Sequence, residues 1–397
     1  MFAIIYFMVN IQIAPDPIQK ITQMGDVTLY EPAGDQPFSE RPRLPTGKYQ
    51  SHSLAECITN VSTPMGKKPI LKTMLTTACE RDCYYCPFRA GRAKTRRMTI
   101  TADDLAKAFL ALQQGGAVDG LFLSSGIIKG SIPTQDKLLD AADIIRRKHH
   151  YRGYIHLKIM PGIEDAQLYR AMQLADRISV NLEAPTQERL NALAPKKHLE
   201  RELLAMVHMA EQIRRAHPHE KLARTVTQFV VGAVGDTDLE LLSLTNNLHR
   251  HLGLTRAYFS AFHPILQTPF ENLAPTDALR EFRLYQSSFL LRDYGWEVED
   301  LPFGQGGNLP TDVDPKKAWA EAHLREQPVD LQTADRAQLL RVPSIGPKGA
   351  EAILKARRQG KLAALADLCK LGIAAPERAA PYILLDGKRP AWQERLF

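Results

Sequence analysis

The chain of 397 residues is 44% hydrophobic and 24% charged, a composition that allows a packed core and excludes a disordered protein. Its five cysteines are too few for a disulfide scaffold, and three of them cluster, which favours a reducing cytosol and a metal site. The net charge is +7, and residues 328–397 carry 12 Lys or Arg against 7 Asp or Glu, which indicates a polyanionic partner such as nucleic acid.

The N-terminal part has no regular hydrophobic period and contains turn sequences such as PAGDQP and RPRLPTG. We therefore expect residues 1–69 to form an extension that wraps the core. Its first 13 residues, MFAIIYFMVNIQI, are apolar but too few to span a bilayer, and they lack the basic region of a secretory signal. We expect a buried β segment there, no membrane contact and a cytoplasmic location.

Residues 70–300 alternate between short apolar runs and amphipathic helical segments. The expected strands are residues 70–76, 120–125, 154–159, 177–183, 225–232 and 257–262. The expected helices are residues 101–116, 136–150, 164–175, 199–216, 238–253 and 276–291, the first of them with a capping pair at Thr101 and Asp104. This order predicts parallel βαβ units in an α/β fold, a partial (β/α)6-type barrel with its chemistry at the C-terminal ends of the strands.

The rest of the chain reads as a linker and a second domain. Residues 301–327 include PFGQGGNLPTDVDP, which is rich in Gly, Pro and Asp and indicates a linker. Residues 328–397 consist of short helical segments broken by Gly and Pro, so we expect a small all-α domain.

The sequence CERDCYYC places Cys79, Cys83 and Cys86 directly after the first predicted strand. Thiolates bind soft metals, namely zinc or iron in an iron–sulfur cluster. A structural zinc site needs a fourth ligand, for which Cys57 and His52 are the candidates. The alternative is a [4Fe–4S] cluster held by three cysteines, with one iron left open.

The C-x3-C-x2-C spacing after the first strand, with the aromatic Tyr85 before the third cysteine, resembles the radical S-adenosylmethionine (radical SAM) superfamily. The resemblance implies that Cys79, Cys83 and Cys86 hold a catalytic [4Fe–4S] cluster whose open iron binds S-adenosylmethionine. It further implies reductive cleavage of that cofactor to a 5′-deoxyadenosyl radical, with an external electron donor. Tyr85 would lie near the adenine.

Three further segments fit the same resemblance. It implies that backbone groups of Ser124, Ser125 and Gly126 receive the methionyl amino group, although the family's usual Gly-Gly-Glu is absent and a plain turn is the alternative. Asn181 and Glu183 alternate with apolar residues and would face the ribose; the alternative for Glu183 is a salt bridge with Arg189. Gln228 stands where the family contacts adenine, or simply ends a strand.

The basic run from Arg89 to Arg97 is either a solvated face or a site for a substrate phosphate. In the C-terminal domain, VPSIGPKGAEAI resembles a helix-hairpin-helix, with Ser344 and Gly346 in the hairpin and Pro347 opening the second helix. The N–H groups at such a helix start suit a phosphate. The residues expected at the nucleic acid are Ser344, Gly346, Lys348, Gly349, Arg357 and Arg358.

A second, less complete hairpin copy follows at Leu371-Gly372-Ile373. The alternative for the whole domain is a small helical module that binds proteins.

The combination of both parts resembles a bacterial group of radical SAM proteins described as DNA-modification or DNA-repair proteins. We therefore expect a radical SAM enzyme that modifies or repairs a nucleotide in DNA, with a co-encoded DNA-repair enzyme as a further partner. The alternatives are a radical SAM enzyme acting on RNA or a peptide, and a non-catalytic Fe–S protein that binds DNA.

Overall fold

The computed structural model describes residues 16–24, 53–63, 66–93 and 95–391. The apolar segment at residues 1–13 and His52 lie outside the described residues. No helix in these described ranges is long and apolar enough to cross a membrane.

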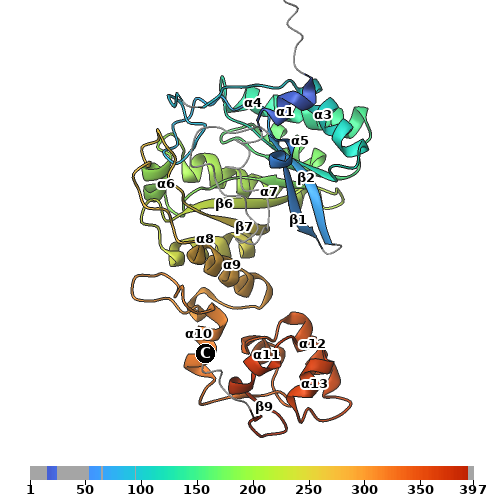
Figure 1. Ribbon diagram of the computed structural model, residues 1–397, viewed down its shortest axis with the longest axis vertical. Helices are drawn as coiled ribbons and strands as arrows, with labels where there is room; N and C mark the ends of the chain where they lie inside the picture. Colours follow the sequence, from blue (N-terminus) through green and yellow to red (C-terminus); the bar gives the residue numbers. More distant parts are fainter. Residues whose placement is uncertain (1–15, 25–52, 64–65, 94, 392–397) are drawn as a thin grey trace, which may run out of the picture. The chain divides into compact units, whose positions relative to one another are not determined.

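Seven strands form one sheet in the order in which they follow along the chain (Figure 1). They are β1 (Ile58–Thr63), β2 (Gly66–Met74), β3 (Gly120–Ser124), β4 (Tyr154–Lys158), β5 (Arg177–Ser179), β6 (Arg224–Val231) and β7 (Leu254–Ala261). The β2–β3, β3–β4 and β6–β7 pairs are parallel, whereas β1 runs antiparallel to β2. Since β1 and β7 are its two edges, the sheet is open, a curled half-barrel that confirms the α/β fold and the partial barrel.

The sheet differs from the prediction in two places. Strand β1 was not predicted, because ITNVST lies in a stretch without a clear hydrophobic period. Strand β5 ends at Ser179 instead of Glu183, because Glu183 adopts a left-handed conformation with φ of 67°. That conformation interrupts a regular strand in any residue other than glycine.

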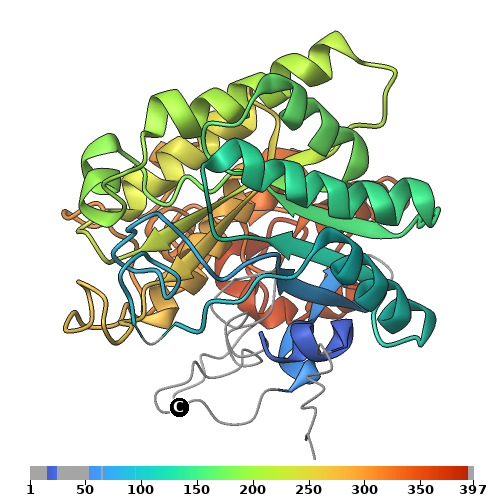
Figure 2. The same cartoon turned by 90° about the horizontal axis from the view of Figure 1, so that it is seen from above.

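Contacts along the chain separate the described residues into two compact units, the first with those up to residue 81, those within 87–178 and residues 221–223, and the second with residues 82–86, 179–220 and 224–391. Within the first unit, helices α3, α4 and α5 pack against one another in chain order (Figure 2). Its helices are α1 (Pro17–Thr22), the 3₁₀ turn η2 (Leu54–Cys57), α3 (Ala102–Gln114), α4 (Ser131–Asp143), the π turn η3 (Ile144–Lys148) and α5 (Asp165–Leu174). Thr101 caps α3 by accepting a hydrogen bond from the Asp104 N–H, as the capping pair predicted.

The second unit holds the remaining helices of the sheet region, and α8 and α9 pack on each other and on β7. These helices are α6 (Gln187–Leu193), the π turn η4 (Leu199–Leu204), α7 (Ala205–Ala216), α8 (Asp238–His251), α9 (Ala278–Asp293) and the 3₁₀ turn η5 (Val298–Asp300). Helix α6 was not among the predicted helices.

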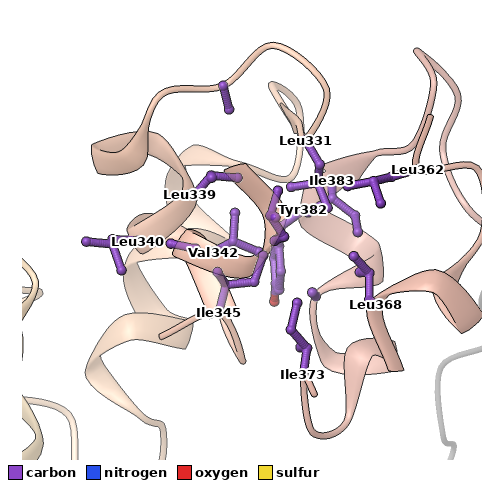
Figure 3. Close-up of a cluster of buried hydrophobic side chains, with 14 of the residues drawn as sticks. Leu331, Leu339, Leu340, Val342, Ile345, Leu362, Leu368, Ile373, Tyr382 and Ile383 are labelled. Carbon is purple, nitrogen blue, oxygen red and sulfur yellow. The ribbon is translucent and has the colours of Figure 1, made fainter. Parts of the chain in front are cut away.

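The C-terminal part of the second unit has a hydrophobic core of its own, drawn in Figure 3. Its elements are α10 (Pro315–His323), β8 (Val329–Asp330), α11 (Arg336–Arg341), α12 (Pro347–Ala356), α13 (Leu365–Lys370), the 3₁₀ turns η6 (Pro376–Arg378) and η7 (Ala380–Tyr382), and β9 (Ile383–Leu384). Two expectations are corrected here. Residues 301–327 are more than a linker, because α10 contributes Ala320 and Leu324 to this core. The segment is also not all-α, since β8 and β9 form a short parallel pair.

Candidate functional site

The cysteine loop begins just after β2 and is held by hydrogen bonds along its length. Cys83 is buried, whereas Cys79 and Cys86 are partly exposed. In the second unit, the Tyr84 N–H donates to the Leu193 carbonyl over 2.9 Å. In the first unit, the Ala90 N–H donates to the Arg81 carbonyl over 2.8 Å. This hydrogen bond connects the residues before and after the segment 82–89.

Arg97 also holds the segment that carries the cysteines. Its guanidinium donates to the carbonyl oxygens of Thr77 (2.8 Å), Phe88 (2.7 Å) and Arg89 (2.7 Å). Arg92 donates to the Pro87 carbonyl over 3.2 Å. These two members of the basic run therefore hold the loop through its backbone carbonyls, Arg92 from a buried position and Arg97 from the exposed face that was one of the two expectations for the run.

The loop after β3 packs closely on the start of the cysteine loop. The Glu80 N–H donates to the Ile127 carbonyl over 2.8 Å, and the Ile127 N–H donates to Cys79 Sγ over 3.4 Å. A Cβ on Gly126 would overlap the Ala78 carbonyl oxygen and would lie 3.2 Å from Cys79 Cβ. Glycine at position 126 is thus required by the close approach of the two segments.

The two serines before Gly126 have different surroundings. Ser124 is buried in β3 with 2% of its surface exposed. Ser125 is partly buried, and its hydroxyl donates to the Gly126 carbonyl over 2.7 Å. The backbone of this turn is the part available to a ligand.

Glu183 forms a buried ion pair with Lys197, with 2.8 Å between Oε1 and Nζ. The exposed fractions of the two side chains are 4% and 11%. A salt bridge had been considered for Glu183, but its predicted partner was wrong. Arg189 instead lies 3.6 Å from Glu240 and donates to the Val234 carbonyl.

Tyr85 places the cysteine loop beside this ion pair, because the Glu183 carboxylate acts on its hydroxyl. Burial raises the pKa of Tyr85 well above its usual value, and the neighbouring Glu183 carboxylate raises it further. Burial alone lowers the pKa of Lys197, but Glu183 and the thiols of Cys83 and Cys86 together raise it above its usual value. Lys197 is therefore a cation at neutral pH.

Asn181 and Gln228, predicted from separate strands, lie together. The Asn181 amide donates to Gln228 Oε1 over 3.3 Å, while the Glu183 N–H donates to the Gln228 carbonyl. Asn181 Oδ1 is buried and has no hydrogen-bond partner. A buried acceptor of this kind is a plausible position for a ligand hydroxyl.

The described residues favour a cluster over a single zinc ion. No group of three His, Cys, Asp or Glu among them is arranged to hold one metal ion, and the Cys57 thiol donates to the Ile21 carbonyl instead. The ligands of a cluster bind different irons, so their sulfur atoms need not converge on one point. Three thiols in one loop, an N–H aimed at Cys79 and a nearby cation on Lys197 fit a [4Fe–4S] cluster.

The C-terminal core supports two helical hairpins. Helices α11 and α12 are joined by residues 342–346, in which Ser344 has a φ of 66°. The buried Lys316 ammonium donates to the Ile345 carbonyl over 2.6 Å, inside this loop. Ser344 and Lys348 are exposed.

The second hairpin packs against the first. It runs from α13 to η6 and has left-handed residues at Gly372 and Ala375. A Cβ on Gly349 would lie 3.3 Å from Ile373, so the two hairpins are in contact at this point. An open cavity of about 850 Å³ is lined by Ser344, Gly346, Lys348, Gly349, Gly372 and Ile373, and by Arg292 at the end of α9.

The last two residues predicted for nucleic-acid binding have different surroundings. Arg358 is exposed. Arg357 donates to the carbonyls of Ala334 (2.5 Å) and Leu331 (3.3 Å), which makes it a structural residue. Two residues were missed by sequence reasoning, namely Lys197 and Lys316, because their partners Glu183 and Ile345 are distant in sequence and leave no local pattern. Arg292 was also missed, although its carboxylate partner is the adjacent Asp293.

Comparison with known proteins identifies the class. Residues 73–244 match the family model described as the Radical SAM superfamily. The match assigns this part of the chain to a radical SAM domain. Members of this superfamily use a [4Fe–4S] cluster and S-adenosylmethionine, and they need an external electron donor.

Solved structures with a similar fold include the FeFe-hydrogenase maturase HydG from Carboxydothermus hydrogenoformans, with a TM-score of 0.45 and 17% identity over 55% of this chain and 50% of that chain. The chain therefore spans about half the length of that HydG. Another is the radical S-adenosylmethionine methyltransferase TsrM from Kitasatospora setae, with a TM-score of 0.38 and 14% identity over 50% of this chain and 38% of that chain. No curated protein matches the sequence.

Proposed function

We propose that this enzyme modifies or repairs a nucleotide within DNA by radical chemistry. Cys79, Cys83 and Cys86 would hold the [4Fe–4S] cluster, at which S-adenosylmethionine would bind. When bound, these groups supply a 5′-deoxyadenosyl radical that abstracts a hydrogen atom from the substrate. The observation that carries the DNA assignment is the pair of hairpins that line one cavity, with Lys348 and the Arg292–Asp293 ion pair in its lining, on the same chain as the radical SAM domain.

The chain's own residues bind and orient the cofactor. The backbone of Ser124, Ser125 and Gly126 receives the methionyl amino group. Asn181 and Gln228 bind the nucleoside, with the buried Asn181 Oδ1 accepting from a hydroxyl. Glu183 contributes by holding the Tyr85 hydroxyl, so that the Tyr85 ring can pack on the adenine.

The C-terminal segment is proposed as a helix-hairpin-helix pair that binds the phosphate backbone. Helix α12 begins at Pro347 beside the exposed Ser344 and Lys348, so its first N–H groups and the lysine charge face the same cavity. Gly346 and Gly349 allow the loop to pack closely, because a Cβ would lie 3.1 Å from the Tyr294 hydroxyl at position 346 and 3.3 Å from Ile373 at position 349. The exposed Arg358 extends the basic face. Contacts of this type position the nucleic acid without reading its sequence.

The reacting nucleotide must reach the radical SAM domain outside the base stack. A base within a duplex is protected by its neighbours, so the substrate nucleotide is single-stranded or flipped. A gene for a base-excision enzyme next to the gene of this protein would support repair over modification.

The test is anaerobic reconstitution of the cluster, followed by measurement of 5′-deoxyadenosine with duplex DNA, single-stranded DNA, RNA or no nucleic acid. We expect faster cofactor cleavage with DNA, and loss of the cluster in Cys83→Ala with DNA binding retained. If only RNA stimulates cofactor cleavage, the substrate is RNA. If the cleavage rates with and without nucleic acid are equal, a peptide substrate is favoured. If the spectrum of the cluster does not change when S-adenosylmethionine is added, the result would support a non-catalytic DNA-binding protein.

Binding by the hairpin is tested separately through its salt dependence. Lys348→Ala should reduce the slope of log K against log salt by about 1, because one phosphate contact is lost. Lys355→Ala is the matched control, since Lys355 is exposed on the same helix but does not line the cavity. Equal slopes for both variants would contradict the assigned binding surface.

A further inference from the structure

The second half of the cysteine loop rests on the segment from Leu193 to Lys197. The Tyr84 N–H donates to the Leu193 carbonyl over 2.9 Å, and Lys196 pairs with Asp82 at 3.5 Å. The next residue, Lys197, turns inward and is 11% exposed, whereas Lys196 is 57% exposed. Two adjacent lysines thus bind the same loop region, one at the surface and one in the interior.

Lys197 is joined to the cysteine loop by a chain of two polar contacts. Its ammonium pairs with Glu183 at 2.8 Å, and the Glu183 carboxylate acts electrostatically on the hydroxyl of Tyr85, which lies between Cys83 and Cys86. Glu183 itself is fixed by backbone hydrogen bonds, since its N–H donates to the Gln228 carbonyl and its own carbonyl accepts from Val230. Movement of Lys197 is therefore transmitted to the residue between two proposed cluster ligands.

We propose that Lys197 is a positioning residue that holds the cysteine loop and also raises the reduction potential of the cluster. This inference rests on the ligand set proposed above. An external low-potential donor gives the cluster one electron, and the cluster becomes more negative by one charge. A fixed cation close to the ligand thiols stabilises that added charge.

The burial of the ion pair makes this effect measurable. Charges in a poorly solvated interior are screened less than surface charges, and the net charge around a cluster is one of the determinants of its potential. The positive charge of Lys197 stabilises the reduced cluster, whereas the negative charge of Glu183 destabilises it. Removing each charge in turn should consequently shift the potential in opposite directions.

The experiment measures the midpoint potential of the reconstituted full-length chain by redox titration followed by electron paramagnetic resonance. For Lys197→Met we expect a shift to lower potential by about 59 mV, which corresponds to a tenfold loss in the equilibrium constant for one-electron reduction. For Glu183→Gln we expect a shift to higher potential. Lys197→Arg, which keeps the charge, should restore a value near that of the wild type.

Lys196→Met is the matched control, because it removes the same charge from the exposed neighbouring position. We expect its potential to stay close to the wild-type value. Shifts of the same sign in Lys197→Met and Glu183→Gln would overturn the inference, as would an unchanged potential in a fully loaded Lys197→Met protein.

Loop positioning is tested in the protein without a cluster, so that a variant that fails to load iron still gives a result. Hydrogen exchange of the amides at residues 82–86 should be faster in Lys197→Met than in Lys196→Met, and equal exchange would refute the positioning role. The proposed ligand set fails on a different observation, namely a full iron content in Cys83→Ala. The two failures are therefore distinguishable.

Discussion

Lys316 makes the stability of the C-terminal part depend on pH. Its side chain is buried, its ammonium donates to the Ile345 carbonyl over 2.6 Å, and it lies 4.7 Å from the centre of the Tyr294 ring. Burial lowers its pKa to about 7, with Arg341 acting in the same direction and Asp314 against it. The perturbation to test is Lys316→Met, which removes the titrating group and keeps a long apolar stem.

The sign follows from the number of protons that each state binds. Between pH 7 and the usual lysine pKa of 10.5, the unfolded chain keeps its proton on Lys316 while the folded chain loses it. The free energy of unfolding therefore rises with pH in this window. From pH 7 to pH 9 the increase amounts to about 2 kcal/mol, taking 1.4 kcal/mol per pH unit once the folded lysine is neutral.

The assay is urea denaturation at pH 7, 8 and 9, followed by the fluorescence of Trp296 and Trp319, whose rings lie 5.4 Å apart in this region. The wild type should gain about 2 kcal/mol more than Lys316→Met over this range, because all other titrating groups cancel in the difference. Lys317→Met, on the exposed side of the same helix, should retain the wild-type dependence. Equal pH dependence in wild type and Lys316→Met would refute the reasoning.

Three further predictions concern the loops. Gly126→Ala should reduce the iron content of the reconstituted protein several-fold, because its methyl group would overlap the Ala78 carbonyl; full loading would contradict the close packing. Arg97→Gln should lower the free energy of unfolding by about 2 kcal/mol, because three loop carbonyls lose a charged donor; a change below about 0.5 kcal/mol would show that water replaces it. Ser344→Gly should leave thermal stability nearly unchanged, since relief of the left-handed strain offsets the added chain entropy; a loss of DNA affinity would then show that the hydroxyl contacts the phosphate.

The regular part of the fold was predictable because each element carries its own signal. The six predicted strands are short apolar runs that end at turn residues, and the first capped helix shows its cap at Thr101. Strand β1 had no such signal, since it is stabilised by its pairing with β2 and not by a local pattern. The region 301–327 was predicted incorrectly because it carries a local signal for a different structure. Its Gly and Pro content is typical of a linker, yet Trp319 packs against Trp296 and Ala320 is fully buried.

The residues that hold the candidate sites escaped prediction for a shared physical reason. Loops that carry functional backbone groups have no strand or helix ladder to satisfy their carbonyl oxygens. Here long basic side chains supply those donors. Arg97 donates to the carbonyl of Thr77 before the cysteine loop, Lys316 to that of Ile345 in the first hairpin, and Arg357 to that of Ala334 before α11. Such a side chain reaches partners 8 to 29 residues away, so no fixed spacing identifies it.

This use of basic side chains to hold loops also changes how the basic character of the chain should be interpreted. A charge run in the sequence was expected to face solvent or phosphate, but Arg97 and Arg357 spend their donors on the protein itself. Of the six residues predicted at the nucleic acid, Arg357 is partly buried and donates to two backbone carbonyls, whereas Lys348 is exposed and lines the cavity between the hairpins. It follows that the affinity for a phosphate backbone depends on few charges at a defined surface, and that substitutions of Arg97 or Arg357 should change stability more than the salt slope of binding.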